Sequence, residues 1–271
     1  DLSNNIKLPS PSELFQDLSL RTLVLSSSNL VFPDIYALNM PNLAFLDLSN
    51  NIDVFESGFM GNSLSKCVDL IHLKMVGIKL SAIEASSIRL IKQIRILNLS
   101  GNLLEKLDQD VFNGNSQLLD LDLSSNKIDR LPPVLFRKTV ELVVLNLSNN
   151  KLSMVQPILF ANLTKLQVLD LSNNRLEVLS DTLFAKNVQL TTLKLNGNKI
   201  KSVRPLTFSQ NTKIITLDLS NNLLKTIEFE VVENMKPLTM LNLNNNLLTD
   251  LAKSFFSKES LYVLNLSCNQ I

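Results

Sequence analysis

The hydrophobic positions of the chain recur with a fixed period from end to end. The repeating unit is LxxLxLxxNxL, as in Leu142, Leu145, Leu147, Asn150 and Leu152. Within LxL the residues alternate between a buried and an exposed face, which is typical of a short β-strand. The Asn position recurs at spacings of 23, 23 and 27 residues, then seven times at 24, and finally at 23. This register predicts a repeat protein in which each unit supplies one strand and one return segment.

The polar position after each strand is expected to form a ladder of Asn side chains. An Asn amide at this place can bond backbone groups of neighbouring coils that would otherwise be buried without partners. The predicted ladder consists of Asn102, Asn126, Asn150, Asn174, Asn198, Asn222, Asn246 and Asn269. In the earlier repeats the same position is occupied by Asn5, Ser28, Asn51 and Ile78.

A second core position follows ten residues after the ladder position, and it is Phe in most repeats. One aromatic residue per repeat predicts a continuous spine in the core rather than a cofactor site. The predicted spine consists of Phe15, Phe112, Phe136, Phe160, Phe184, Phe208 and Phe256.

The 24-residue repeat with this Phe resembles the extracellular leucine-rich repeats of animals, as found in Toll-like receptors, chaoptin-like adhesion proteins and Slit-like ligands. The resemblance implies an α/β solenoid, a right-handed horseshoe with a parallel β-sheet on its concave face. Irregular or short helical return segments would form the convex face. Proteins, lipids or nucleic acids bind family members through the concave face or an edge. We expect one solenoid over residues 1–271 with about 11 to 12 repeats, truncated at both ends without cysteine-rich caps, and hence a piece of a longer protein.

Composition narrows the classes of function. The repeat accounts for the 57 Leu and 32 Asn residues, and the chain has only 6 Gly and 1 His, with no Trp. So few Gly residues argue against a Gly-rich nucleotide loop. His72 is alone, so no His-based catalytic dyad is expected, and no Cys or His spacing resembles a metal site. We therefore expect a protein that is not an enzyme, with no catalytic residues, no metal and no cofactor.

The outward positions of the predicted strands form the candidate binding face. One column of these positions is more apolar than exposure to solvent requires, and the next column is mildly acidic and rich in amides. An apolar stripe beside hydrogen-bonding groups suits a protein-binding surface. Alternatively, β-branched residues occupy these positions only because they fit a pleated surface. The candidate contact residues are Phe45, His72, Ile96, Asp122, Val144, Val168, Asp170, Lys194, Asp218, Met240 and Val263.

Charged residues also line up from repeat to repeat. The carboxylates of the second column are interpreted as a solvated sheet face, because a catalytic pair needs contrasting enclosed environments. A basic edge after the ladder is interpreted as solvated too, with docking of an anionic ligand as the alternative. Nucleic acid is not an expected ligand, since the net charge is only +1 and aromatic residues do not interleave with the basic ones. The carboxylates are Asp47, Asp122, Asp170 and Asp218; the edge is Lys127, Lys151, Arg175 and Lys199, beside Glu105, Asp129 and Glu177.

The repeat around residues 52–78 is irregular. Its spacing is 27 residues, Asp53 replaces an inward Leu, and Ile78 replaces the ladder Asn. A three-residue insertion must bulge from the coil if the adjacent strands keep their register. Our hypothesis is that Phe55 and Phe59 in this bulge contact a ligand or a second copy of the chain. The alternative is that the insertion folds inward and fills the space left by the interrupted ladder.

Cysteines and glycosylation sequons give weaker signals. Cys67 occupies a core position and is expected to pack as a small hydrophobic residue. Cys268 follows a strand, and the two thiols are too many repeats apart to form a disulfide with each other. Asn162, on a return segment, is the better candidate for an N-glycan. The remaining sequons, Asn98, Asn146 and Asn265, belong to the strand consensus LNLS.

These patterns favour a ligand-binding ectodomain of a cell-surface receptor of the Toll-like or a similar class, acting in signalling or innate immunity. The expected partner is a protein ligand, a co-receptor or a second copy of the chain. No stretch approaches 18 consecutive apolar residues, so this piece is not expected to insert into a membrane, whereas the parent chain can carry an anchor. Two alternatives stay open, a secreted or membrane-anchored adhesion or matrix protein and a scaffold arm of an enzyme or cytosolic complex.

Overall fold

The computed structural model describes residues 1–5, 19–29, 39–51 and 64–271. These residues form two compact units, Asp1–Leu142 and Val143–Ile271. Each unit is described by itself below. The expectation of one solenoid over residues 1–271 stays a prediction.

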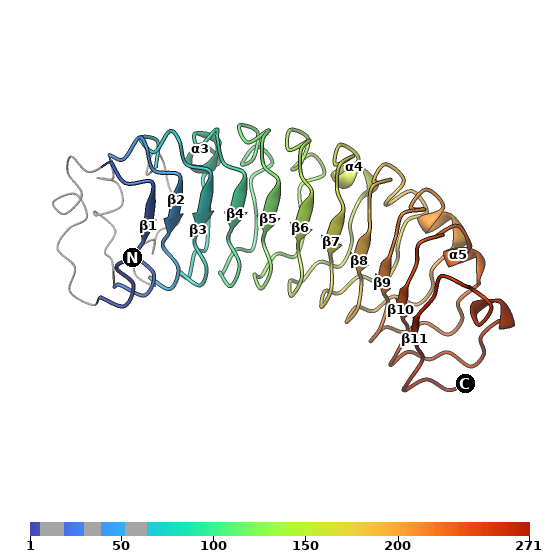
Figure 1. The fold of residues 1–271 in the computed structure, drawn as a ribbon. Coiled ribbons are helices and arrows are strands. Elements are labelled where there is room, and N and C mark those ends of the chain that lie inside the picture. Colours follow the sequence, from blue (N-terminus) through green and yellow to red (C-terminus); the bar gives the residue numbers. More distant parts are fainter. Residues whose placement is uncertain (6–18, 30–38, 52–63) are drawn as a thin grey trace. The chain divides into compact units, whose positions relative to one another are not determined.

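Each strand is three residues long and lies parallel to its neighbours, in register, within its unit (Figure 1). The central residue of each strand is Leu, and from β1 to β10 it is buried while both flanking residues face outward. Unit 1 contains β1 (Thr22–Val24), β2 (Phe45–Asp47), β3 (His72–Lys74), β4 (Ile96–Asn98) and β5 (Asp120–Asp122). Unit 2 contains β6 (Val144–Asn146), β7 (Val168–Asp170), β8 (Thr192–Lys194), β9 (Thr216–Asp218), β10 (Met240–Asn242) and β11 (Val263–Asn265).

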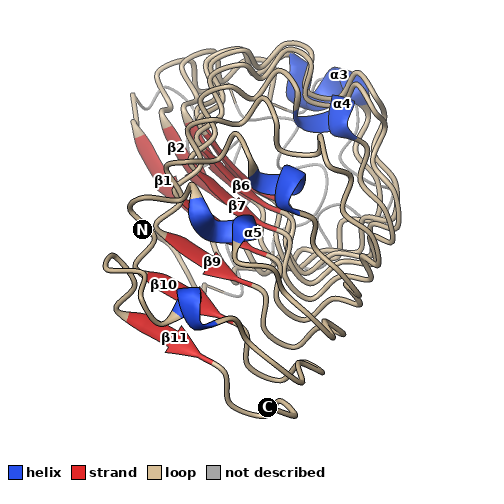
Figure 2. Ribbon diagram, turned by 90° about the vertical axis from the view of Figure 1, so that its right-hand side faces the viewer, coloured by secondary structure: helices blue, strands red, loops and turns tan. Residues whose placement is uncertain are grey.

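The return segments of each unit lie on the side opposite the strands and carry short helices (Figure 2). Pro is the first residue of α4 and of η1, where its missing N–H costs no hydrogen bond. The helices are α3 (Ala85–Arg89), α4 (Pro157–Phe160), η1 (Pro205–Phe208), α5 (Glu230–Glu233) and η2 (Lys253–Phe255). The predicted fold class, a solenoid with a parallel sheet on one side and irregular or short helical return segments on the other, is confirmed.

Where the ladder position after a strand is Asn, its side chain bonds the backbone of two successive coils. Asn174 shows the full set: its Nδ2 donates to the carbonyl oxygens of Leu147, Leu171 and Ser172 at 2.9, 3.1 and 3.2 Å. Its Oδ1 accepts the Leu152 backbone N–H at 3.0 Å. The same pattern recurs at Asn102, Asn126, Asn198, Asn222, Asn246 and Asn269.

The residue before the ladder position adopts a left-handed backbone conformation. Asn173 has φ of 53°, and Gly197 has φ of 66° at the equivalent place. Asn and Gly tolerate this region better than other residues, which explains why Asn pairs recur in the sequence.

Phe rings fill the interior between the strands and the return segments. Phe112 and Phe136 of unit 1 stack with centroids 6.1 Å apart. In unit 2, Phe184 stacks on Phe160 at 6.3 Å and on Phe208 at 5.8 Å. Phe15 lies outside the described residues.

The prediction of Phe256 as a spine residue is wrong. Phe255 is buried, with 1% of its surface exposed, whereas Phe256 is 68% exposed. The reason is the 23-residue spacing between Asn246 and Asn269, one residue shorter than the regular spacing. In this shorter coil the inward position therefore comes one residue earlier.

A second set of buried Asn residues, which the sequence analysis missed, lies on the return segments. Asn187 Nδ2 donates to the carbonyl oxygens of Phe160 and Leu163, each at 2.9 Å. Asn115 and Asn211 make equivalent bonds within their units. The signal was the Asn three residues after the spine Phe, as in Phe184 to Asn187.

At the irregular repeat, Ile78 is fully buried and packs as an apolar core residue. Its backbone N–H donates to Asn102 Oδ1 at 3.0 Å, and the Leu80 N–H donates to the same oxygen at 3.0 Å. The ladder residue of the following coil thus bonds this turn. Asp53, Phe55 and Phe59 lie outside the described residues, so the hypothesis on this bulge stays a prediction.

The ladder predicts a stability difference between neighbouring Asn residues. Asn174→Ala removes the partners of buried backbone groups in two coils, and each unpaired group costs about 1–3 kcal/mol. We expect a loss of roughly 2–4 kcal/mol in the free energy of unfolding, measured by urea denaturation. Asn173→Gly, one residue away, keeps the left-handed turn and should change stability by only a few tenths of a kcal/mol. Equal effects of both substitutions would contradict this role of the ladder.

The shifted spine predicts opposite outcomes for two adjacent Phe residues. Phe255→Ala should leave a cavity and cost about 3–5 kcal/mol. Phe256→Ala should change stability by less than about 0.5 kcal/mol, because the ring is exposed. Thermal and urea denaturation of the two variants measure the difference. A larger loss of stability for Phe256→Ala would contradict the shift and indicate that Phe256 is the core residue.

Candidate ligand-binding surface

In unit 1 the first outward column carries a cluster of rings. The rings of Phe45 and His72 meet edge to face with centroids 4.6 Å apart, and Lys74 Nζ lies 5.6 Å from the centre of the Phe45 ring. Phe45, His72 and Ile96 are half-buried. Register pairing of β2, β3 and β4 brings these three residues side by side.

His72 is held in its neutral form by this environment. Burial lowers the pKa of His72 below its usual 6.5, the positive charge of Lys74 lowers it further, and Asp47 opposes the shift. A neutral imidazole against Phe45 offers a partner an apolar and hydrogen-bonding surface rather than a charge.

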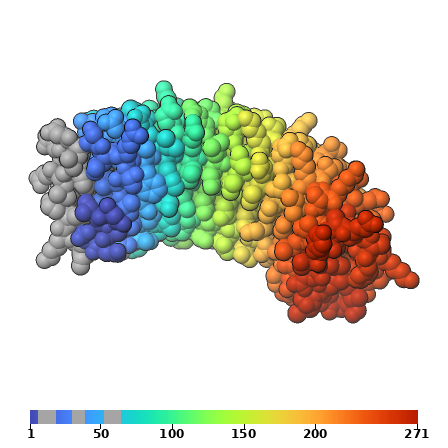
Figure 3. Space-filling model, in the orientation of Figure 1, coloured from blue at the N-terminus to red at the C-terminus, as the bar shows by residue number. Residues whose placement is uncertain are grey.

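In unit 2 the first column becomes more exposed toward β11. Val144 and Val168 are half-buried, whereas Met240 is 40% and Val263 45% exposed. Large apolar side chains at these outward positions are available for contact. The coils form successive bands in sequence order, so each column of a unit draws one residue from each repeat (Figure 3).

The second outward column has a structural task that the sequence did not reveal. The Asp170 carboxylate accepts the Ser172 backbone N–H at 2.9 Å and the Ser172 hydroxyl at 2.6 Å. Asp218 accepts the same two bonds from Ser220, and Asp122 accepts the Ser124 backbone N–H at 2.8 Å. Local bonds of this kind close the turn that follows the strand. One oxygen of each of the candidate contact residues Asp122, Asp170 and Asp218 is thus bonded within the chain.

Charges on the two outward columns pair with each other or repel. Lys194 Nζ lies 3.4 Å from Asp170 Oδ2. Burial raises the pKa of Asp120, and the nearby Asp122 raises it further. Among the residues that the structure describes, no group of three or more His, Cys, Asp or Glu side chains is placed to hold a metal ion.

Two of the carboxylates beside the basic edge pair with basic residues outside that edge. Glu177 Oε2 accepts Lys201 Nζ at 2.9 Å, and this hydrogen bond lowers the pKa of Glu177, with Lys199 making a small further contribution. Lys127, Arg175 and Lys199 have exposed side chains, and Lys151 is half-buried. In unit 1, Arg130 pairs with Asp129 at 3.5 Å.

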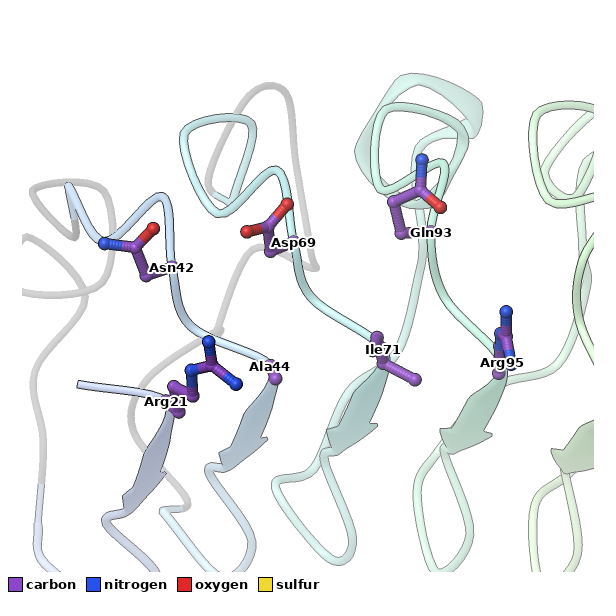
Figure 4. A pocket seen from close by; sticks show the side chains of 7 residues that line it. All are labelled: Arg21, Asn42, Ala44, Asp69, Ile71, Gln93 and Arg95. Carbon is purple, nitrogen blue, oxygen red and sulfur yellow. The ribbon is translucent and has the colours of Figure 1, made fainter. Parts of the chain in front are cut away.

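A shallow pocket in unit 1 was not anticipated from the sequence. It has a volume of about 270 Å³ and lies where the chain enters β1 to β4. Its lining forms two rows (Figure 4): Asn42, Asp69 and Gln93 in one, and Arg21, Ala44, Ile71 and Arg95 in the other. The second row is the position just before each strand, and the repeat register could have identified it as a further column.

Both cysteines are free thiols. Cys67 is buried, as predicted, and burial raises the pKa of its thiol. Cys268 is exposed and adopts a left-handed conformation with φ of 56°. Asn162 is exposed, whereas Asn98 and Asn146 are half-buried and use Oδ1 to accept the backbone N–H of Ser100 and Ser148. Asn265 Oδ1 bonds Ser267.

No helix among the described residues combines the length and apolar character needed to cross a membrane.

Comparison with known proteins identifies the repeats and the fold. The family model described as leucine rich repeat matches residues 92–152, 140–200 and 188–248. No curated protein matches the chain. Among solved structures, TLR13 in complex with the RNA ssRNA13 is similar, with a TM-score of 0.82 and 26% identity over 91% of this chain.

Two other similar structures come from different kinds of organism. Toll of Drosophila, in complex with Spatzle, has a TM-score of 0.74 and 24% identity over 96% of this chain. A leucine-rich repeat protein of Leptospira interrogans has a TM-score of 0.84 and 26% identity over 97%. The chain covers 36% of the TLR13 chain, 39% of the Toll chain and 64% of the Leptospira chain.

These similarities support a protein-interaction module that resembles Toll-like ectodomains. The expectation that nucleic acid is not a ligand gains no support, because the TLR13 structure is a complex with RNA. Since the matched repeats cover more than half of the chain and recur as one strand and one return segment, the chain belongs to the leucine-rich repeat family.

Proposed function

We propose that the chain is the ligand-recognising part of a receptor ectodomain and binds a protein through the outward face of its strands. The observation that carries this proposal is the first outward column. It presents Phe45, His72 and Ile96 in unit 1 and Met240 and Val263 in unit 2. Aromatic residues and Met are enriched in protein interfaces, where fully buried apolar contacts are surrounded by polar groups.

The surface is also held rigid, which lowers the entropy lost on binding. Within each unit the strands are bonded to their neighbours, and most turns are closed from inside by a ladder Asn and from outside by an Asp or Asn of the second column. Candidate contact residues therefore stand on a backbone that does not need to reorganise. The bonds of Asp122, Asp170 and Asp218 to the turns add to this stiffness.

Recognition without catalysis fits the chemistry of the described residues. An acid–base pair needs two groups whose pKa values are driven apart by enclosed environments. The outward carboxylates instead close turns or, in the case of Asp170, pair with Lys194. We therefore include in the proposal that the protein is not an enzyme.

The proposal of a receptor rests on the similar solved structures as well as on the outward face of the strands. The Toll structure contains the protein Spatzle, which supports a protein ligand and an extracellular or cell-surface setting for this chain. Exposure of Asn162 is compatible with a glycan in that setting. Bacterial proteins share the fold, so the fold by itself does not distinguish a receptor from an adhesion protein.

The coding sequence on both sides of these 271 residues tests the receptor assignment. We expect a secretory leader upstream and, downstream, a spanning helix of about 20 apolar residues followed by a signalling domain. A downstream anchor without a signalling domain would favour an adhesion protein. A catalytic domain, or the lack of a leader in the complete reading frame, would contradict the proposal.

Self-association distinguishes a receptor from a homophilic adhesion protein. We expect the purified chain to sediment as a monomer, because its outward face is meant for a different protein. If it dimerises, Met240→Ser with Val263→Ser should be tested against Val178→Ser, an equally apolar residue that is 77% exposed on a return segment. Dimerisation lost only in the Met240 and Val263 variant would assign the face to a second copy and overturn the heterophilic proposal.

A further inference from the structure

The pocket at the entry to β1–β4 holds two arginines that have no acidic partner among the described residues. Arg21 and Arg95 are exposed, and the ion pairs among the described residues do not include either of them. Two other arginines of unit 1 do pair, Arg137 with Asp110 at 2.7 Å and Arg130 with Asp129 at 3.5 Å. A guanidinium that binds no carboxylate is available to an anionic ligand.

The backbone beneath the pocket is fully bonded. The Arg21 carbonyl oxygen accepts the N–H groups of Ala44 and Phe45 at 2.9 and 3.0 Å. The same double acceptance recurs at the carbonyl oxygens of Ala44, Ile71 and Arg95. The floor between the two arginines is therefore fixed, and it is apolar, because Ala44 and Ile71 form it (Figure 4).

The spacing of the arginines sets the length of the ligand. Arg21 and Arg95 are three strands apart, which is ~14 Å at ~4.8 Å per strand. An extended peptide rises ~3.4 Å per residue, so four residues span nearly the same distance. Residues i, i+2 and i+4 of such a peptide share one face.

We propose that this pocket binds an extended acidic segment of a protein partner, with two carboxylates four residues apart on Arg21 and Arg95. The residue midway between them lies over Ala44 and Ile71 and is uncharged. The inference rests on the proposed function, protein recognition, and assigns to it a ligand chemistry and a place. Asn42 and Gln93, in the other row of the pocket lining, offer amide groups to the backbone of the segment.

Asp69 supplies selectivity. Its carboxylate lies in the row of Asn42 and Gln93, beside Ile71 and at a position along the pocket between the two arginines, so it repels an acidic side chain at the middle of the segment (Figure 4). The same carboxylate, with Asp47, Asp120 and Asp122 on the neighbouring strands, disfavours a continuous polyanion. His72 and Lys74 lie against the half-buried Phe45 ring, which leaves less of it for stacking on a base. An acidic peptide therefore fits better than RNA.

The test uses a blocked nine-residue peptide of Ser and Thr with Glu at its third and seventh positions and Val at its fifth. Binding to the whole chain is measured by biosensor with the peptide immobilised. We expect binding that weakens between about 0.1 and about 1 M salt, as the Debye length falls from ~10 to ~3 Å. Arg21→Ala with Arg95→Ala should weaken it roughly tenfold, the loss of about 1.4 kcal/mol.

Matched controls separate this pocket from general charge. Arg130→Ala with Lys138→Ala removes the same charge from exposed positions of unit 1 and should leave binding unchanged. The peptide with Lys in place of both Glu residues should not bind. The peptide in which Glu also replaces the Val at the fifth position should bind the Asp69→Asn variant at least severalfold more tightly than it binds the unchanged chain.

Equal binding of the Glu and Lys peptides, or equal loss in the control variant, would overturn the pocket assignment. Tighter binding of a 13-residue oligouridine that depends on Arg21 and Arg95 would assign the pocket to RNA and overturn the peptide proposal. Neither outcome tests the outward column of Met240 and Val263. The proposed protein recognition by that column can therefore hold even if the pocket proposal is wrong. Unchanged thermal melting of the arginine variants ensures that lost binding is not lost folding.

Discussion

The structure depends on satisfying backbone groups that are buried wherever a coil turns away from its strand. One Asn amide does this for two coils at once, since Asn174 donates to its own coil and to the preceding one and accepts from the preceding one. Such a bond pattern needs coils of nearly equal length, because each amide must meet the equivalent atoms of its neighbour. The 24-residue period is therefore a consequence of hydrogen bonding as much as of hydrophobic packing.

Regular stacking has a consequence for binding. Once every turn is tied, the outward side chains become fixed columns with a spacing of ~4.8 Å, and selectivity lies in which residue each repeat contributes. The irregular repeat, residues 52–78, contains Ile71 and β3, and Ile71 lines the pocket together with Ala44, the residue just before β2. The departure from the regular repeat and the pocket therefore occur in the same part of unit 1.

Much of the core could be predicted from the sequence. The inward Leu residues, the ladder position and the burial of Cys67 follow from position in the repeat alone. Phe256 shows the limit of that reasoning: a coil shortened by one residue moved the inward position to Phe255, and counting from Asn246 could not reveal where the deletion is absorbed. The buried Asn115, Asn187 and Asn211 were visible in the sequence, but their partners lie one coil away.

The sequence by itself determined the class of fold, the inward and outward sets and the lack of Gly-rich or His-rich chemistry, because these depend on period and composition. Only the tertiary structure decided which outward groups are free. Asp170 is engaged by Ser172 and Lys194, Glu177 by Lys201 rather than by the neighbouring basic column, and Arg21 and Arg95 by no carboxylate among the described residues. The physical reason is that a side chain's partner is set by the geometry between adjacent coils, and a one-dimensional pattern does not contain that geometry.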